Sequence, residues 1–396
     1  MPCRTIQTRL CRTAFFLSFL LIIANCATIH RDGDLPLVEN EQQAVFALIA
    51  QKEDAIRSGD IDRFLAVLNR QMPEYAIEQQ HWFQYYQNAD VSELRLEPVD
   101  IAKRDANTYI VTLRQQYLYG ANRTKRECRF NQKYIRTPLG WKDSDLEFQE
   151  RKTAHFHLMA VDTVSEDKLE TIAENAETAF RLVQQAYGDV PQDITLIKIY
   201  DDPYLVRELT KVSAERTMHG WYEYPESIKI AVRKSNRYAY TRTLAHELMH
   251  KTSLSKARNQ CPWFAEGLAV YFGTFQALGG TYIDRGWLTT REHVHPISWL
   301  EEKNPENLTE RSEESRFYGT SGMVVKHIEA CYGRGKSKDL VAALSRFPQT
   351  DEGFEYQKHN VLYTRQLHEA IQATLGVDSA TFNDRWLAWI KTQHQP

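Results

Sequence analysis

Apolar residues recur every three or four positions along several stretches of the chain, which is the spacing of a helix with one buried face. The longest stretch runs from Ser165 to Tyr187, where Ser165 can cap the first turn and Gly188 can end the last. The same spacing predicts a helix over Thr241–Ser253, uninterrupted by Pro or Gly. Further helices are predicted over Gln42–Ser58, Ile61–Leu68, Glu74–Gln87, Met323–Ala330 (opened by Phe317–Gly322) and a final aromatic segment capped by Asp378 or Ser379.

Strict alternation of apolar and polar residues, the pattern of a strand with one buried face, occupies two separate parts of the chain. Asp193–Tyr200 and Ser227–Val232 alternate in this way before the helix at Thr241. Nearer the start, four such stretches follow one another: Leu94–Ile101, Tyr109–Tyr119, Lys125–Ile135 and Trp141–Phe148. Helices followed by a run of strands predict an α+β fold with a curved antiparallel sheet in the front part of the chain.

The first residues have a composition of their own. Arg4, Arg9 and Arg12 precede an apolar run over Ala14–Ala24, which is typical of a signal peptide and is short for a membrane span. Ile23-Ala24-Asn25-Cys26 resembles a bacterial lipobox, although Asn25 stands where Gly or Ala is usual. A lipid on Cys26 would tether the protein to a membrane surface, and simple secretion is the alternative. We expect the bacterial cell envelope (periplasm or outer membrane) or the exterior as its location.

The length of 396 residues permits two domains. We expect a signal peptide over 1–26, a linker over 27–40, and domains over 41–150 and 151–396. The formal net charge of −3 argues against a general nucleic-acid binder, and the basic cluster around Arg126 is typical of a solvated strand face. Cys128, Cys261 and Cys331 can form one disulfide in an oxidising compartment or stay free, and the sequence does not choose a pair.

The helix at Thr241–Ser253 carries His246-Glu247-Leu248-Met249-His250. Residues four apart share one helical face, so both imidazoles can bind one ion. Zinc takes imidazole nitrogen at about 2.0–2.1 Å and needs such convergence. Glu247 is placed to reach a zinc-bound water without binding the metal, which is the H-E-x-x-H arrangement of metallopeptidases. The alternative is an amphipathic helix whose polar residues are satisfied by their neighbours.

A catalytic zinc needs a third protein ligand. Glu266 is the only acidic residue between Cys261 and Phe272, a stretch rich in large apolar side chains that Pro262 suits as a helix start. A buried carboxylate is costly unless it is paired or binds metal, so Glu266 is the candidate. The alternative is a first-turn glutamate favoured by the helix dipole.

These two segments together resemble the gluzincin, or thermolysin-like, zinc metallopeptidases, and in particular the peptidase-MA-like domains of bacteria. The likeness rests on His246-Glu247-x-x-His250 followed by Trp263-Phe264-x-Glu266-Gly267-Leu268-Ala269-x-Tyr271. It implies that His246, His250 and Glu266 hold Zn²⁺ and that Glu247 is the general base. The 16 positions from His250 to Glu266 are fewer than in thermolysin itself, so substrate preferences are not carried over.

The same resemblance suggests roles outside the two motifs. A Tyr at the place of Tyr318 implies a donor to the developing oxyanion, with His327 and His219 as weaker candidates; packing or a surface role is the alternative for each. An edge strand at the place of Ser227–Val232 implies pairing with an extended substrate, and an ordinary sheet strand is the alternative. The front part, with its turn at Ser58-Gly59-Asp60, resembles the NTF2-like cone, a fold that fixes no function.

The sequence therefore predicts an NTF2-like cone of helices on a curved antiparallel sheet, followed by a zincin-type domain with a mixed sheet and helices. The expected activity is hydrolysis of peptide bonds in a peptide or protein substrate, with Glu247 moving the proton and Tyr318 assisting at the oxyanion. The alternative is a zinc-stabilised binding or scaffold protein of the cell envelope without turnover. The presence of Glu247 argues against that alternative, since a structural site needs no base.

Overall fold

The structure, a computed structural model, describes residues 36–232, 238–279, 294–349 and 356–393. The predicted signal peptide and Cys26 lie outside these residues. The chain divides into two compact units, residues 1–43 and 44–396. Of the first unit the structure describes only the beginning of helix α1 (Pro36–Ser58), which starts within the predicted linker. All that follows concerns the second unit.

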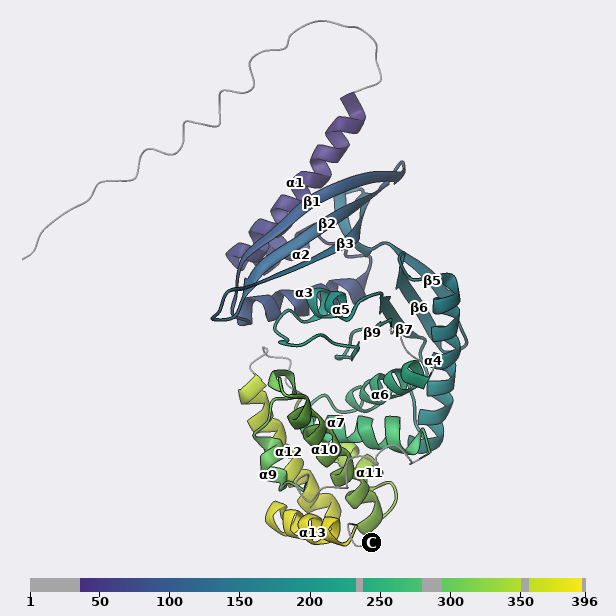
Figure 1. The fold of residues 1–396 in the computed structure, drawn as a ribbon, viewed down its shortest axis with the longest axis vertical. Helices are drawn as coiled ribbons and strands as arrows, with labels where there is room; N and C mark the ends of the chain where they lie inside the picture. The colour runs from purple at the N-terminus through teal and green to yellow at the C-terminus, as the bar shows by residue number, and fades with distance from the viewer. Residues whose placement is uncertain (1–35, 233–237, 280–293, 350–355, 394–396) are drawn as a thin grey trace, which may run out of the picture. The chain divides into compact units, whose positions relative to one another are not determined.

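The front part of this unit is an antiparallel sheet with helices against it (Figure 1). Its four strands follow one another in the order β1-β2-β3-β4, with irregular register in β1 that bends the sheet. All four predicted strands and the three predicted helices are confirmed, within a few residues at each end. Their bounds are β1 Val91–Asp105, β2 Thr108–Tyr119, β3 Thr124–Thr137, β4 Gly140–Leu146, α2 Ile61–Val67 and α3 Pro73–Asn88.

The rear part contains a mixed sheet of five strands in the order β5-β6-β7-β9-β8. The central strands β6, β7 and β9 are parallel, while β5 and β8 are antiparallel to their neighbours. The bounds are β5 Phe148–Lys152, β6 Phe156–Val161, β7 Thr195–Tyr200, β8 Gly220–Trp221 and β9 Ile228–Ala231. The strand predicted over Ser227–Val232 is therefore internal, and the short β8 forms the edge in its place.

Both faces of the central strands are buried, which corrects the expectation of half-buried strands. Ile197 and Ile199 are fully buried, as the alternation requires. However, Lys198 and Lys229, on the polar face, are only 2 % and 1 % exposed. Their side chains form ion pairs with Glu78 of α3 in the front part, so this face is covered by protein and not by water. The sequence pattern identified the faces correctly but misassigned what covers the polar one.

Helix α4 (Glu166–Tyr187) begins and ends at the two capping residues predicted from the sequence, Ser165 and Gly188. The Ser165 side chain accepts a hydrogen bond from the Lys168 N–H, which satisfies one free donor of the first turn. Gly188 ends the helix with a φ of 74°, a left-handed conformation that glycine adopts without a steric penalty. The Asp378 side chain caps the last helix, α13 (Ser379–Thr392), in the same way, and Phe382 and Trp386 of that helix are buried.

Three helical segments around α6 (Tyr238–Leu254) build the centre of the rear part. Helix α7 (Pro262–Leu268) continues directly into a π-helix, η1 (Ala269–Gln276), where one regular helix was expected. Helix α10 covers Arg311–Cys331 and not only Met323–Ala330. The segment Phe317–Gly322, expected to open the helix, lies inside it: Gly319 and Gly322 are buried in α10, and Gly322 lets Val270 of η1 pack directly against the helix.

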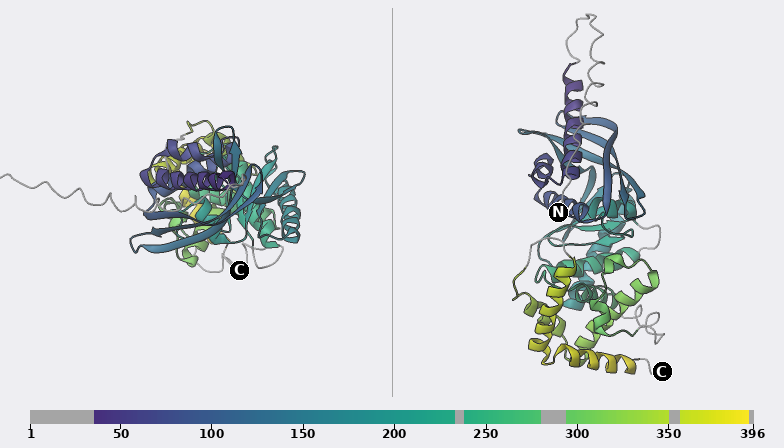
Figure 2. Two further views of the ribbon diagram at one scale, coloured as in Figure 1. Left: turned by 90° about the horizontal axis from the view of Figure 1, so that it is seen from above. Right: turned by 90° about the vertical axis from the view of Figure 1, so that its left-hand side faces the viewer.

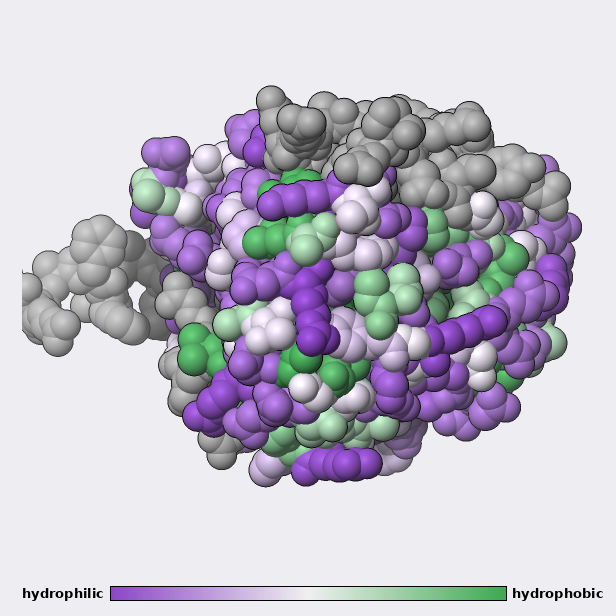
Figure 3. Space-filling view, turned by 90° about the horizontal axis from the view of Figure 1, so that it is seen from below, coloured by the Kyte–Doolittle hydropathy of each residue, from purple (hydrophilic) through white to green (hydrophobic). Residues whose placement is uncertain are grey.

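The remaining helices complete the rear part, with α12 and α13 at the end of the unit far from the four-stranded sheet (Figures 1 and 2). On the face drawn in Figure 3, hydrophobic residues form small patches separated by hydrophilic ones. None of the described helices is both long and apolar enough to span a bilayer. The remaining bounds are α5 Pro203–Thr210, α9 Ile297–Glu301, η3 Pro305–Asn307, α11 Lys336–Leu344 and α12 Tyr356–Leu375.

Candidate metal centre

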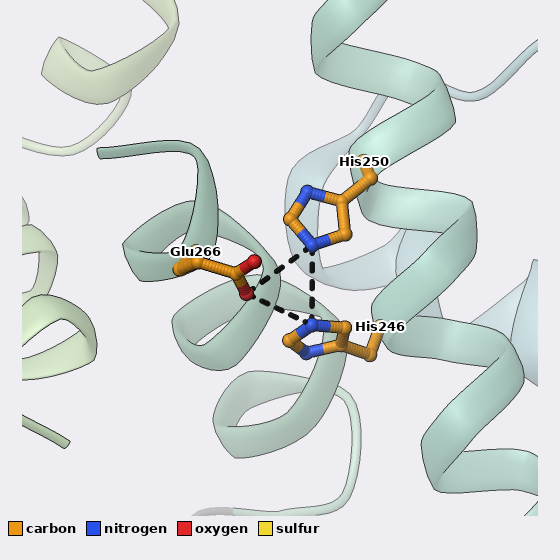
Figure 4. A group of neighbouring side chains, drawn as sticks. All are labelled: His246, His250 and Glu266. Atoms are coloured by element: carbon orange, nitrogen blue, oxygen red, sulfur yellow. Dashed lines mark hydrogen bonds and ion pairs between the residues drawn. The ribbon is translucent and has the colours of Figure 1, made fainter. Parts of the chain in front are cut away.

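The two histidines of α6 and the glutamate of α7 point at one another (Figure 4). The His246 and His250 Nε2 atoms are 3.1 Å apart. The Glu266 Oε2 atom lies 3.2 Å from the first of these nitrogens and 3.3 Å from the second. Two residues one turn apart on α6 and one residue in the first turns of α7 thus form a nearly equilateral triangle of donor atoms.

The size of this triangle fits a zinc ion. Tetrahedral zinc with bonds of about 2.0–2.1 Å separates its ligand atoms by about 3.3–3.4 Å. The three separations of 3.1, 3.2 and 3.3 Å lie at or just below the lower limit of that range. Two imidazole nitrogens and one carboxylate oxygen are also a donor set that catalytic zinc sites use, with a fourth position left for water or substrate. The residues therefore fit the metal that the sequence suggests.

The electrostatics of the three residues are those of a strongly coupled group. Burial by itself raises the pKa of the Glu266 carboxyl, but the charge of His250 and hydrogen bonds from both imidazoles bring that pKa well below its usual range. Burial lowers the pKa of His250, and the nearby Glu266 carboxylate more than reverses this effect. The carboxylate is thus ionised and available as a ligand at neutral pH.

Glu247 of α6 lies close enough to His246, His250 and Glu266 to interact with their charges, and it is 7 % exposed. Burial raises the pKa of its carboxyl, and Glu266 adds to the increase, while His246 and His250 oppose it. Its neighbour on the other side is Gly220 of β8, where a β-carbon would overlap the Glu247 carboxyl group. The glycine therefore allows the edge strand to approach the candidate base closely, a constraint that the sequence did not reveal.

Tyr318 of α10 lies beside the candidate ligand His246. Its ring centroid is 6.2 Å from that of His246. Burial raises the pKa of the phenol well above its usual value, and the Glu266, Glu314 and Glu247 carboxylates raise it further. Tyr318 therefore stays protonated and keeps a hydrogen to donate.

The two weaker candidates lie elsewhere. His327 is 1 % exposed and packs among aromatic rings, including Tyr332 and Trp389, with no hydrogen-bond partner for either ring nitrogen among the described residues. His219 is exposed and directly precedes β8, and its carbonyl accepts a hydrogen bond from Ala231. His327 thus belongs to the core around α13.

Helix packing brings the ligands together at short range. Gly273 of η1 lies against the backbone of Ala245 and His246, and a β-carbon there would come within 2.5 Å of the Ala245 carbonyl oxygen. A single glycine in η1 therefore permits the close approach of η1 to α6 at the level of the first ligand. A short π-helical segment directly after a ligand helix is a local irregularity of the kind often found at functional sites.

A second group of histidine and acidic residues lies between the front and rear parts. His81 of α3 and two glutamates of the β8–β9 turn, Glu223 and Glu226, have ligand-type atoms within 4.8 Å of one another. Unlike the first group, both carboxylates have other partners. Glu226 forms an ion pair with Lys229, and the Tyr85 hydroxyl donates to Glu223.

Two further expectations, on the cysteines and on the basic cluster, can be compared with the structure. Among the described residues Cys128, Cys261 and Cys331 are free thiols. In the basic cluster, Arg126 does not stand in solvent: it donates to the carbonyls of Val212 and Ala214 and lies over the Tyr119 ring. These contacts give that arginine a structural role between the two parts of the unit.

The residues that sequence reasoning missed are Gly220 and the α3 side chains that reach the β8–β9 turn. A two-residue strand is too short for a period to show, and α3 was considered only as part of the front fold.

Comparison of the chain with models of protein families and with curated proteins gives no match.

Proposed function

We propose that the chain is a zinc-dependent peptidase of the gluzincin type, with an NTF2-like front part. The observation that carries the proposal is the triangle of His246, His250 and Glu266, whose edges match those of a tetrahedral zinc site. The mixed α+β architecture and the position of Glu247 beside the triangle support it. A location in the cell envelope or outside the cell goes with the signal peptide expected from the sequence.

The residues of the chain have distinct tasks in this proposal. Zinc bound by the triangle would supply Lewis acidity, which lowers the pKa of a water molecule towards about 7. Glu247 accepts a proton from the attacking water and passes it to the leaving nitrogen as the C–N bond breaks. Tyr318 donates its phenolic hydrogen to the oxygen of the scissile carbonyl, where negative charge develops. Water is consumed, and a carboxyl group and an amine are released.

The edge strand β8 offers a way to hold the substrate. It pairs with β9 on one side and with no other strand among those that the structure describes. A free strand edge binds an extended peptide through main-chain hydrogen bonds, largely without regard to side chains. Because Gly220 of this strand touches Glu247, a peptide added there would pass close to the base.

The direct test is Glu247→Gln, which keeps the shape of the side chain but removes its basicity. We expect hydrolysis of casein or of a peptide library to fall by about 10²–10⁴-fold, since general-base catalysis contributes about that much. Zinc content stays at one ion per chain, because Glu247 is not a ligand. Glu150→Gln, an exposed position on β5, serves as the matched control and keeps full activity.

Two results would count against the proposal in different ways. A Glu247→Gln protein that retains zinc and hydrolyses peptides at the wild-type rate would exclude Glu247 as the base. A wild-type protein that binds zinc yet cleaves no peptide in the library would favour a zinc-stabilised scaffold.

A further inference from the structure

Three side chains on one face of α3 reach across to the rear part of the unit. Glu78, His81 and Tyr85 follow one another at intervals of three and four residues, which places them along one side of the helix. All three contact the same short segment, the turn over 223–227 that joins β8 to β9. The front part therefore holds the segment that carries the edge strand.

The contacts to this turn are polar, and most of the groups are buried. The Glu78 carboxylate accepts hydrogen bonds from the N–H (3.1 Å) and the hydroxyl of Ser227. The His81 Nδ1 atom is 2.5 Å from a Glu226 carboxylate oxygen, and the two side chains are 16 % and 3 % exposed. Charged hydrogen bonds shielded from water are stronger than exposed ones.

The turn over 223–227 also determines where β8 lies, because it joins β8 to β9. Trp221 pairs with Lys229 and Gly220 with Ile230 in the antiparallel ladder. The Lys211 ammonium bridges the two sides, because it lies 4.0 Å from the centre of the Tyr85 ring and 4.5 Å from that of the Trp221 ring. A continuous series of contacts thus leads from α3 through the turn to Gly220, and Gly220 touches the Glu247 carboxyl group.

We propose that α3 positions the substrate-binding edge of the rear sheet against the metal centre, with His81 and Tyr85 as positioning residues that act through Glu226 and Glu223. The proposal rests on the proposed peptidase function and assigns the front part a role in the reaction. The described hydrogen bonds of both side chains are with the β8–β9 turn, so each acts on the geometry of β8 and not on zinc binding.

The partners of the two glutamates favour this role over a second metal site. Glu226 also forms an ion pair with Lys229, whose ammonium group opposes the approach of a dication. Glu223 accepts the Tyr85 hydroxyl, so one of its oxygens is engaged. The polar groups here are matched to one another, as they are in a structural contact between two parts of a protein.

The test compares His81→Gln and Tyr85→Phe with wild type on peptides of increasing length. A long extended peptide can use every main-chain bond that the edge offers, whereas a dipeptide derivative is too short to do so. We therefore expect kcat/KM for a hexapeptide or longer to fall by about tenfold, mainly through KM, since small misplacements of a binding edge are costly. For a dipeptide derivative we expect less than about a twofold change.

The controls separate positioning from simple loss of structure. His157→Gln removes a similar histidine–glutamate pair, 2.8 Å long, from the opposite edge of the same sheet, and it should change neither substrate class. Melting temperature is measured for all variants, and the double variant His81→Gln/Glu226→Gln should lose little more than either single one.

Each outcome decides the matter. If kcat/KM falls equally for short and long peptides, the positioning role is wrong. It is also wrong if both variants keep the kinetics of a wild-type protein that hydrolyses peptides. Neither result affects the peptidase function. A second equivalent of bound zinc that disappears in His81→Gln also overturns it and assigns the cluster to metal binding. Absence of hydrolysis by the wild-type protein overturns this proposal together with the peptidase function.

Discussion

The two groups of histidine and glutamate in this molecule differ in what surrounds their carboxylates. In the group of His246, His250 and Glu266, the contacts that link the residues run between the prospective ligand atoms themselves. In the group of His81, Glu223 and Glu226, a lysine and a tyrosine from neighbouring elements already engage the two carboxylates. Both groups contain residue types that bind zinc, yet only in the first do the described contacts join the three ligand-type atoms directly to one another.

The comparison teaches that convergence matters more than composition. Ligand atoms separated by the edge of a coordination tetrahedron indicate a metal site, whereas atoms that meet a cation or a hydroxyl indicate an ion-pair network. The network around Glu78 shows the second case in full. Its carboxylate contacts Lys198 and Lys229, which lower the pKa of the buried acid although burial alone raises it.

The largest effect should come from removing the third ligand. Glu266→Gln takes away the anionic donor, and we expect zinc to be lost and peptide hydrolysis to fall by at least about 10³-fold, because the metal contributes several kcal/mol to catalysis. Glu226→Gln, the equivalent change in the second group, should leave zinc at one ion per chain. Metal analysis of both purified variants checks this. Equal zinc contents would show that the two groups do not differ in metal binding.

Another buried histidine, His327, extends the comparison to a ring that has no acidic partner among the described residues. Burial, and secondarily Arg385, lowers the pKa of His327 to about 4, against about 6.5 in the unfolded chain. The unfolded state therefore binds the proton first as the pH falls. Stability is complete above about pH 6.5, and about 3 kcal/mol is lost by pH 4.

The variant His327→Leu should lack this share of the acid sensitivity. Urea unfolding at pH 7 and pH 4 measures the free energy of unfolding of each protein. We expect wild type to lose about 3 kcal/mol more than the variant between these two values. Equal losses would show that the imidazole is not held neutral in the aromatic core.

The smallest of the three effects concerns the contact between the edge strand and the base. In Gly220→Ala the added methyl group would overlap Glu247, so the strand or the carboxyl group must shift. We expect kcat/KM to fall by about tenfold with zinc retained, since the first group stays intact. Gly120→Ala, where the space is open but a φ of 71° strains any side chain, is the control for general destabilisation away from the metal centre. A Gly220→Ala protein with the wild-type kcat/KM would show that β8 can move away from Glu247 without a cost.

The convergence of His246, His250 and Glu266 could be predicted because these residues lie close together in the sequence. Residues 246 and 250 must share a face of any helix, and Glu266 stood out as the one acid in an apolar segment. What covers the polar face of β7 could not be predicted, since Lys198 meets Glu78 across 120 positions of the chain. The edge strand was missed for another reason: two residues carry no period, and only the contact of Gly220 with Glu247 reveals their place.

The lysines buried in the rear sheet also constrain how this chain can change over time. Lys198 and Lys229 share the carboxylate of Glu78, which a segment more than a hundred residues earlier supplies. Replacing Glu78 leaves each buried ammonium group with only its nearer acid, Asp145 or Glu226, a penalty of several kcal/mol. Substitutions on the two sides are therefore tolerated mainly as compensating pairs, and neither part is free to be exchanged for a foreign module without its counterpart.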